Sequence, residues 1–135
     1  LITYTNDWDD VAKAKEAGLN LVNQGADVLL PYLDNGIVGV LQAAKEKQVW
    51  AVGSITDIGK LAPEVNLAST NMDFAEATAT VMEMAKAGQL ERKDYRFALG
   101  SKPGPMGSMS DQVPAELKAE VEKMVSEMAA GTFQF

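Results

Sequence analysis

The sequence predicts an α/β fold, a three-layer sandwich in which helices cover both faces of a parallel sheet. Residues 27–32 and 49–55 form nearly unbroken apolar runs, which are typical of strands buried on both faces. Segments with helical spacing stand next to these strands, at 9–24 and 37–47. Counted from a strand at 1–5, the order is β-α-β-α-β, which indicates βαβ units.

The first two helices are predicted from their apolar stripes. The stripe of the first helix consists of Val11, Ala14, Leu21 and Val22. Gly25 follows it and suits a C-cap. The stripe of the second helix consists of Ile37, Val40, Leu41 and Ala44.

Further elements are predicted in the second half of the chain. Residues 65–70 form a short strand, and 74–85 form a helix that ends at Gly88. Residues 95–99 form another strand. The Gly and Pro residues of 100–107 predict a loop without regular structure.

The carboxyl-terminal part is predicted to hold one more helix and one more strand. Pro114 suits the first position of the helix, which ends at Gly131. Residues 132–135 form the terminal strand. Because no repeat, low-complexity tract or linker interrupts the chain, residues 1–135 are predicted to be a single α/β lobe.

The composition excludes several functions. The chain carries 12 basic and 19 acidic residues, a net charge of -7, which argues against binding nucleic acid or an anionic membrane surface. It contains no Cys and no His, so thiolate nucleophiles, Ser-His pairs and thiolate or imidazole metal sites are absent. We expect no enzyme activity, no metal and no cofactor.

The amino-terminal end starts within a predicted strand. Leu1 is not an initiator Met, and no apolar stretch reaches the roughly 20 residues that cross a bilayer. We therefore expect the chain to be a piece of a longer protein.

Two loops at the ends of predicted strands suggest a binding site. Residues 32–36 follow the strand at 27–32, and 53–57 follow the apolar run at 49–52. Because the carboxyl ends of parallel strands meet at one sheet edge, both loops are expected at the edge where α/β proteins bind ligands. The sequence therefore predicts binding of a small molecule.

The residues of these loops have competing interpretations. Asp34 or Asn35 suits an N-cap, with Gly36 allowing a turn, while the helix start could also bind a polar ligand atom. Trp8 either stacks on a ligand or only covers the sheet edge. Beside it, Asn6 or Asp7 is interpreted as the cap of the following helix, and Asp9 and Asp10 as charges that offset the helix dipole.

Several segments occur in a distinctive order and spacing. They are 4–10 (Tyr-Thr-Asn-Asp-Trp-Asp-Asp), 12–17, 23–28, 42–47, 51–53 and 57–63, with a Gly-initiated terminal segment at 131–135. In this order the chain resembles the basic membrane protein family, also called purine nucleoside receptor A-like proteins. These are solute-binding proteins of ABC importers.

The resemblance implies the fold and the partners. It implies a type I periplasmic-binding-protein fold, in which two lobes close on a solute. This chain would be most of the second lobe, with the amino-terminal lobe of the same protein missing. The implied partners are a permease and an ATPase. The implied location is extracytoplasmic, in the periplasm or lipid-anchored at the cell membrane.

The resemblance also implies a solute. Trp8 stands where the family stacks an aromatic ring on the base, and residues 34–36 match its cleft loop. Ile55 replaces an Asp that would hold ribose hydroxyls, Asp57 keeps a second Asp, and Met72 replaces a Lys. Apolar side chains cannot form the hydrogen bonds that sugar hydroxyls lose when they leave water. A nucleobase or related heterocycle is therefore favoured over a nucleoside.

The predicted ligand-binding residues are Trp8, Tyr32, Asp34, Asn35, Gly36, Ile55, Thr56, Asp57, Asn71 and Met72. Two alternatives stay open. One is the effector-sensing domain of a transcription regulator with the same fold. The other is a flavodoxin-like enzyme in which Asp7 and Asp57 pair beside a metal.

Overall fold

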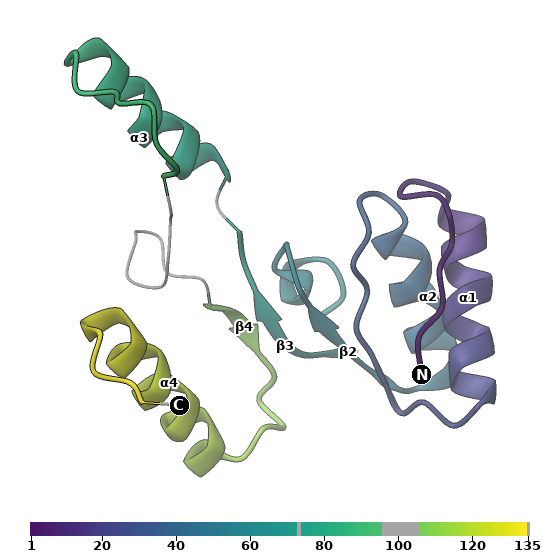
Figure 1. The fold of residues 1–135 in the computed structure, drawn as a ribbon. Coiled ribbons are helices and arrows are strands. Elements are labelled where there is room, and N and C mark those ends of the chain that lie inside the picture. Colours follow the sequence, from purple (N-terminus) through teal and green to yellow (C-terminus); the bar gives the residue numbers. More distant parts are fainter. Residues whose placement is uncertain (73, 96–105, 135) are drawn as a thin grey trace. The chain divides into compact units, whose positions relative to one another are not determined.

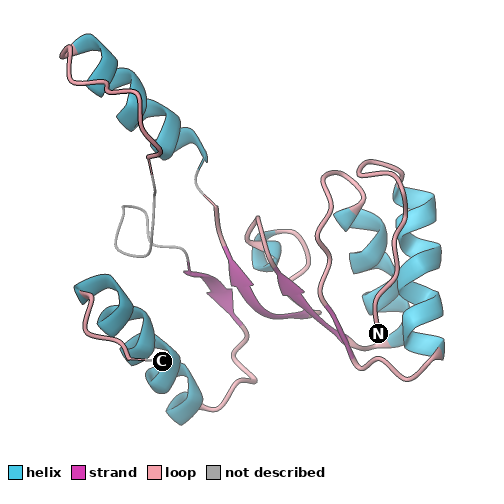
Figure 2. Cartoon of the chain, in the orientation of Figure 1, coloured by secondary structure: helices cyan, strands magenta, loops and turns pink. Residues whose placement is uncertain are grey.

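A computed structural model describes residues 1–72, 74–95 and 106–134. The chain divides into two compact units. The first unit consists of Leu1–Asn71 and Met106–Val113, and the second of Met72–Pro105 and Pro114–Phe135. Helices and strands alternate along the chain (Figures 1 and 2), which confirms the predicted α/β class.

The first unit contains a four-stranded sheet in the order β1-β2-β3-β4. The strands are β1 (Val28–Leu29), β2 (Trp50–Gly53), β3 (Asn66–Thr70) and β4 (Met106–Met109). β1 pairs with β2 and β2 with β3, both in the parallel orientation that was predicted. β4 pairs with β3 antiparallel, so the sheet is mixed.

At residues 106 and 107, β4 corrects the irregular loop predicted over 100–107, and the other residues of that loop lie outside the described part of the chain. The sequence of β4, Met-Gly-Ser-Met, has little strand propensity of its own. Pairing places Ala68 opposite Met109 and Thr70 opposite Met106. The strand is therefore stabilised by its neighbour β3, which a local pattern cannot reveal.

Two helices of the first unit match their predicted positions. Helix α1 spans Val11–Asn23 and helix α2 spans Ile37–Lys47. A short 3-10 helix, η1 (Ile58–Lys60), follows β2 and was not predicted. Gly25 has a φ of 99° directly after α1, which agrees with its predicted place at the helix end.

Helices α1 and α2 cross at very small residues. A Cβ on Gly39 of α2 would meet the backbone carbonyl of Val11, and a Cβ on Gly18 of α1 would lie 2.9 Å from the Cβ of Ala43. Ala14, also on α1, is fully buried. The backbones therefore approach closely because the side chains between them are absent or short.

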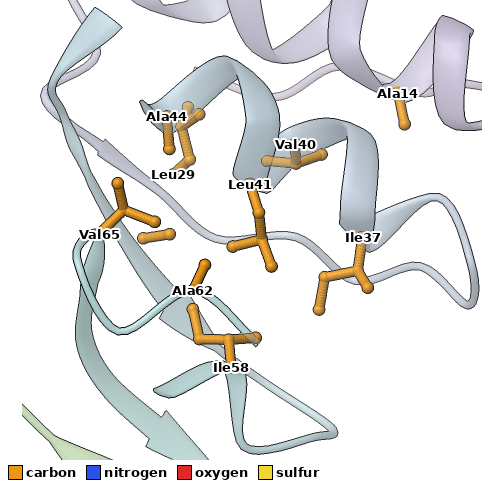
Figure 3. Close-up of a cluster of buried hydrophobic side chains, with 10 residues drawn as sticks. Ala14, Leu29, Ile37, Val40, Leu41, Ala44, Ile58, Ala62 and Val65 are labelled. Atoms are coloured by element: carbon orange, nitrogen blue, oxygen red, sulfur yellow. The ribbon is translucent and has the colours of Figure 1, made fainter. Parts of the chain in front are cut away.

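The core of the first unit lies between α2, the sheet and the segment around η1 (Figure 3). There Ile37 and Leu41 point from α2 toward Ile58 and Ala62. Ile58 is fully buried. The complete buried cluster is Ala14, Leu29, Ile37, Val40, Leu41, Ala44, Ala51, Ile58, Ala62 and Val65.

The structure also corrects two predicted terminal strands. Residues 1–5 form no strand, and Ile2 and Tyr4 are 83% and 82% exposed. In the described part of the chain, β1 is an edge strand that pairs with β2, and residues 1–5 do not pair with its other side. At the other end, Thr132 and Phe133 donate their N–H groups to the carbonyl of Glu127 and so complete a helix end.

The second unit contains α3 (Phe74–Lys86) and α4 (Ala115–Ala130). Pro114 is the N-cap of α4, one position before its first helical residue. Gly131 ends α4 with a φ of 69°, and Gly88 has a φ of 68° just after α3. Both helix ends agree with the sequence prediction. The predicted strand at 95–99 lies outside the described residues apart from Tyr95, which is not in a strand.

Candidate functional site

The loops that follow β1, β2 and β3 meet at one edge of the sheet. The hydroxyl of Ser54, after β2, donates to the carbonyl of Pro31, after β1, at 2.6 Å. The hydroxyl of Thr70, at the end of β3, donates to the carbonyls of Gly53 and Ser54 at 3.2 and 3.0 Å. Side-chain hydrogen bonds therefore join the carboxyl ends of the three strands, the edge of an α/β sheet where ligands bind.

Two aromatic rings are exposed beside this edge. Trp8 and Tyr32 are 55% and 57% exposed, and their ring centroids lie 6.2 Å apart at an interplanar angle of 68°. This is an edge-to-face pair. The backbone carbonyl of Trp8 also accepts hydrogen bonds from the N–H groups of Asp34 and Gly36, at 3.1 and 2.9 Å. The backbone of Trp8 thus holds the 34–36 loop in place.

Asn35 is fixed by Asp9 rather than serving as a helix cap. The Asp9 Oδ1 accepts from the Asn35 side-chain amide at 2.9 Å and from its backbone N–H at 3.3 Å. The N-cap of α2 is Gly36, which makes no side-chain capping bond. The predicted capping by Asp34 or Asn35 is therefore wrong, because Trp8 and Asp9 supply the partners of this loop.

Gly36 is required by close packing rather than by a turn. Its φ and ψ are -56° and -23°, an ordinary helical conformation. A Cβ at this position would lie 2.9 Å from the carbonyl oxygen of Trp8 and 3.4 Å from the Cβ of Ala14. Glycine therefore lets the loop reach the Trp8 carbonyl.

The acidic residues before α1 divide their roles differently from the prediction. Asp10 is the N-cap and accepts from the N–H of Lys13 at 3.0 Å. Asp7 accepts from the N–H groups of Asp9 and Asp10 at 2.9 and 3.1 Å. These two backbone hydrogen bonds lower the pKa of the Asp7 carboxyl below its usual value. The predicted cap of α1 by Asn6 or Asp7 is therefore wrong, because Asp10 is the N-cap.

A cavity of about 590 Å³ opens beside Trp8 and Tyr32. It is lined by residues 2–8, by Ala17, Gly18 and Leu21 of α1, by residues 29–33 and by Val40 of α2. Its walls are mainly apolar, with Leu29 buried and Leu30 exposed. Such a hollow, with aromatic rings at its side, fits an apolar or flat molecule better than a highly charged one.

Asp57 is bonded within the protein through both carboxylate oxygens. Its Oδ1 accepts from the N–H of Gly59 at 3.1 Å, and its Oδ2 accepts from the hydroxyl of Ser108 at 2.8 Å. Partial burial raises the pKa of the Asp57 carboxyl, but the hydrogen bonds from Ser108 and Gly59 lower it by more. The pKa of Asp57 therefore lies below the usual value for aspartate.

This lowered pKa predicts how Asp57 affects stability with pH. Because the folded-state pKa is below the unfolded value, the ionised carboxylate stabilises the protein above about pH 4, and the stabilisation is lost as the pH falls toward the folded-state pKa. We expect Asp57→Asn to lower the melting temperature at pH 7. The melting temperatures of Asp57→Asn and the wild type should become more similar as the pH falls from about 7 to about 3. A difference in melting temperature that does not change with pH would contradict the lowered pKa of Asp57.

The other predicted site residues are distributed as follows. Ile55 is half-buried and Thr56 is exposed, both directly after β2, and Asn71 is half-buried after β3. Met72 belongs to the second unit and is 48% exposed. The remaining predicted residues all belong to the first unit, with Trp8, Tyr32 and residues 34–36 joined by the contacts above.

Several residues of the site were missed by the sequence analysis. Asp9, Ser54, Thr70 and Ser108 each join segments far apart in the chain. The only local signal was the position of Ser54 and Thr70 at strand ends, where small polar residues suit loop contacts. The partners could not be predicted because each lies across at least 16 residues of sequence.

The described residues contain no group of three metal-binding carboxylates. Across the described ranges, none of the helices combines the length and the apolar character that a membrane crossing requires.

The fold is that of an α/β module whose carboxyl-end loops meet at one sheet edge, and comparison with known proteins identifies the family. The family described as ABC transporter substrate-binding protein PnrA-like (Bmp) matches residues 2–127. The chain belongs to this family of solute-binding proteins, which is not an enzyme family. The family resemblance and the lobe-type fold expected from the sequence are both confirmed.

Two relatives with assigned functions are similar in sequence. The transcriptional activator protein med of Bacillus subtilis is 30% identical over 122 residues, which cover 90% of this chain and 38% of that protein. A purine-binding protein of Brucella abortus is 29% identical over 66 residues, 49% of this chain and 18% of that protein. The chain thus spans well under half the length of these relatives.

Three solved structures are similar to nearly the whole chain, each match covering 98% of it. A transcriptional activator of the comK gene from Bacillus halodurans gives a TM-score of 0.84 at 26% identity, with 47% of that chain covered. A solute-binding protein of an ABC transporter system from Conexibacter woesei gives a TM-score of 0.65 at 28% identity, with 45% of that chain covered. A solute-binding protein of an ABC transporter system from Aeropyrum pernix gives a TM-score of 0.77 at 15% identity, with 46% of that chain covered. At this identity the match supports the fold alone.

Proposed function

We propose that this chain is a solute-binding lobe of an ABC importer and that its solute is a small, flat heterocycle of the purine type. The observation that carries this proposal is the exposed pair of Trp8 and Tyr32 at the carboxyl-end loops, in a member of a solute-binding family. Aromatic faces stack on any purine ring. The purine-binding relative of Brucella supports the same ligand class.

A nucleobase is favoured over a nucleoside. Ile55 and Met72 stand where the family resemblance implies an Asp and a Lys. The carboxylate of Asp57 already accepts hydrogen bonds from Ser108 and Gly59. It therefore has less capacity than a free carboxylate to accept hydrogen bonds from sugar hydroxyls. Without charged partners, the hydroxyls of a ribose would lose hydrogen bonds to water and gain few in return.

Transport would follow from closure on the solute. In this proposal the chain works with a second lobe of the same protein and delivers its solute to a membrane permease driven by an ATPase. Closure couples solute binding to recognition by the permease, because only the closed shape presents both lobes together. The protein would act outside the cytoplasm, in the periplasm or lipid-anchored to the membrane.

Thermal-shift measurements on the full-length gene product test the ligand class. A bound solute stabilises the native state according to its affinity and concentration. We expect adenine and guanine to raise the melting temperature more than adenosine and guanosine at equal concentration. Free ribose serves as the control and should cause no shift.

The opposite order would contradict the preference for a base. If nucleosides stabilise the protein more, the side chains at 55 and 72 do not exclude the sugar. If neither purines nor nucleosides cause a shift, the purine-type ligand is wrong.

A second candidate function is effector sensing in a transcription regulator. The similarity to the activator med, at 30% identity, and to the comK activator, at a TM-score of 0.84, favours it. The same edge site would then bind an effector rather than a transported solute.

Cell fractionation of the full-length gene product separates the two candidates. An importer component is expected at the outer side of the membrane, accessible to protease in intact cells or, where an outer membrane encloses a periplasm, in spheroplasts. A regulator is expected inside the cell, protected from protease, and its DNA affinity should change when adenine is added.

A further inference from the structure

A chain of hydrogen bonds surrounds η1 and links it to β3 and β4. The N–H of Ile58 donates to the hydroxyl of Ser69 at 3.1 Å, and this hydroxyl donates to the Asn66 side-chain carbonyl at 2.9 Å. The Asn66 amide donates to the backbone carbonyl of Ser108 at 3.2 Å. Asp57 completes the network through Ser108.

This network lies in a closely packed place. Asn66 and Ser69 are 2% and 1% exposed, and every buried side-chain nitrogen or oxygen atom among the described residues has a hydrogen-bond partner. A Cβ on Gly59 would lie 2.5 Å from the Cβ of Ser108, and one on Gly107 would lie 3.0 Å from the Asp57 Cγ. The partners therefore have little room to rearrange.

The loop between β2 and η1 is attached at both ends. At its start Ser54 donates to Pro31, and at its end Asp57 binds Ser108 and Gly59. Only Ile55 and Thr56 lie between these two attachments. A Cβ on Gly53 would lie 2.6 Å from the Thr56 carbonyl oxygen, so the loop turns back tightly over the strand end.

We infer that Asp57 is a positioning residue for the proposed solute site, which fixes Ile55 and Thr56 by anchoring their loop to Ser108 of β4. This inference rests on the proposed function for its effect on the solute. Asp57 acts through the loop because Ser108 and Gly59 occupy its two carboxylate oxygens. Ser108, which comes from a strand 51 residues away in sequence, thereby becomes a determinant of solute preference.

Ser108→Ala in the full-length gene product is the central test, because it removes the anchor and leaves the loop sequence unchanged. We expect amide hydrogen exchange at residues 55–59 to become about tenfold faster, as expected for the loss of a hydrogen bond to a charged group. Ser110→Ala is the matched control. Its hydroxyl accepts from the N–H of Gln112 at 3.2 Å, so exchange at 55–59 should stay at the wild-type rate.

The same variants are then titrated with adenine and with adenosine at a temperature where each is folded. We expect Ser108→Ala and Asp57→Ala to weaken adenine binding by roughly three- to tenfold and to reduce the preference for adenine over adenosine. Asp57→Asn should retain more of the adenine affinity and of the adenine preference than Asp57→Ala, since its amide can still accept from Gly59 and donate to Ser108. A purely structural role would change the melting temperature but not this preference.

Besides an unchanged preference, two results would overturn the inference. One is wild-type exchange at 55–59 in Ser108→Ala. The other is weak adenine binding in Asp57→Ala together with wild-type binding in Ser108→Ala, which would mean that Asp57 contacts the solute directly. The exchange measurement needs no ligand. A wild-type protein that binds neither probe would therefore contradict the proposed function, while the exchange result would still decide the role of Asp57.

Discussion

Gly39→Ala is expected to destabilise the protein by about 3 kcal/mol, the upper end of the usual cost of overpacking. The new Cβ would meet the backbone carbonyl of Val11 and would lie 2.8 Å from the backbone nitrogen of Lys15. Backbone atoms cannot rotate away, so α1 and α2 would have to separate. Denaturant unfolding should show the loss, and the melting temperature should fall by roughly 10 °C.

Whether Gly39→Ala lowers or raises the free energy of unfolding shows whether the steric clash or the higher helix propensity of alanine dominates. Replacing Gly by Ala inside a helix normally stabilises it by up to about 1 kcal/mol. Gln42→Ala is the matched control on the same helix, because Gln42 is exposed and such surface changes usually stay within about 0.5 kcal/mol. Stabilisation by Gly39→Ala would show that the helices do not cross as described.

Trp8→Ala is expected to weaken adenine binding by the full-length gene product by about 10- to 100-fold, because stacking on one base contributes roughly 1–3 kcal/mol. The ring is 55% exposed and lies against Tyr32, so its loss removes a platform without opening the core. The backbone carbonyl that holds Asp34 and Gly36 is unchanged. Isothermal titration calorimetry measures the change in Kd.

Trp8→Phe is the control for the aromatic face. It retains a flat ring, so its Kd should stay within about tenfold of the wild-type value. Wild-type affinity in Trp8→Ala would support the alternative interpretation that Trp8 only covers the sheet edge. The predicted stacking role would then be wrong.

The helices and the central strands could be predicted because their signals are local. The apolar stripes of α1 and α2 and the continuous apolar runs before Tyr32 and Gly53 lie within single segments. The expectation that two loops meet at one sheet edge also followed from strand order. The Ser54 to Pro31 hydrogen bond agrees with it.

The roles of individual site residues were predicted less well. Asp34 and Asn35 stand where an N-cap is common, yet Trp8 and Asp9 bind this loop instead. Asp57 was predicted to contact solute, and this stays a prediction, while both of its carboxylate oxygens accept hydrogen bonds from within the protein. In each case the deciding partner comes from a distant part of the chain.

By itself the sequence determined the α/β class, the positions of the helices and the resemblance to a solute-binding family, because periodic apolar patterns and ordered motifs are local properties. Only the tertiary structure decided that 106–109 form an antiparallel strand, that residues 1–5 form none, and that Ser108 anchors the loop of Asp57. The reason is physical. A strand exists only with a partner, and a polar side chain takes whichever partner folding brings within hydrogen-bond distance.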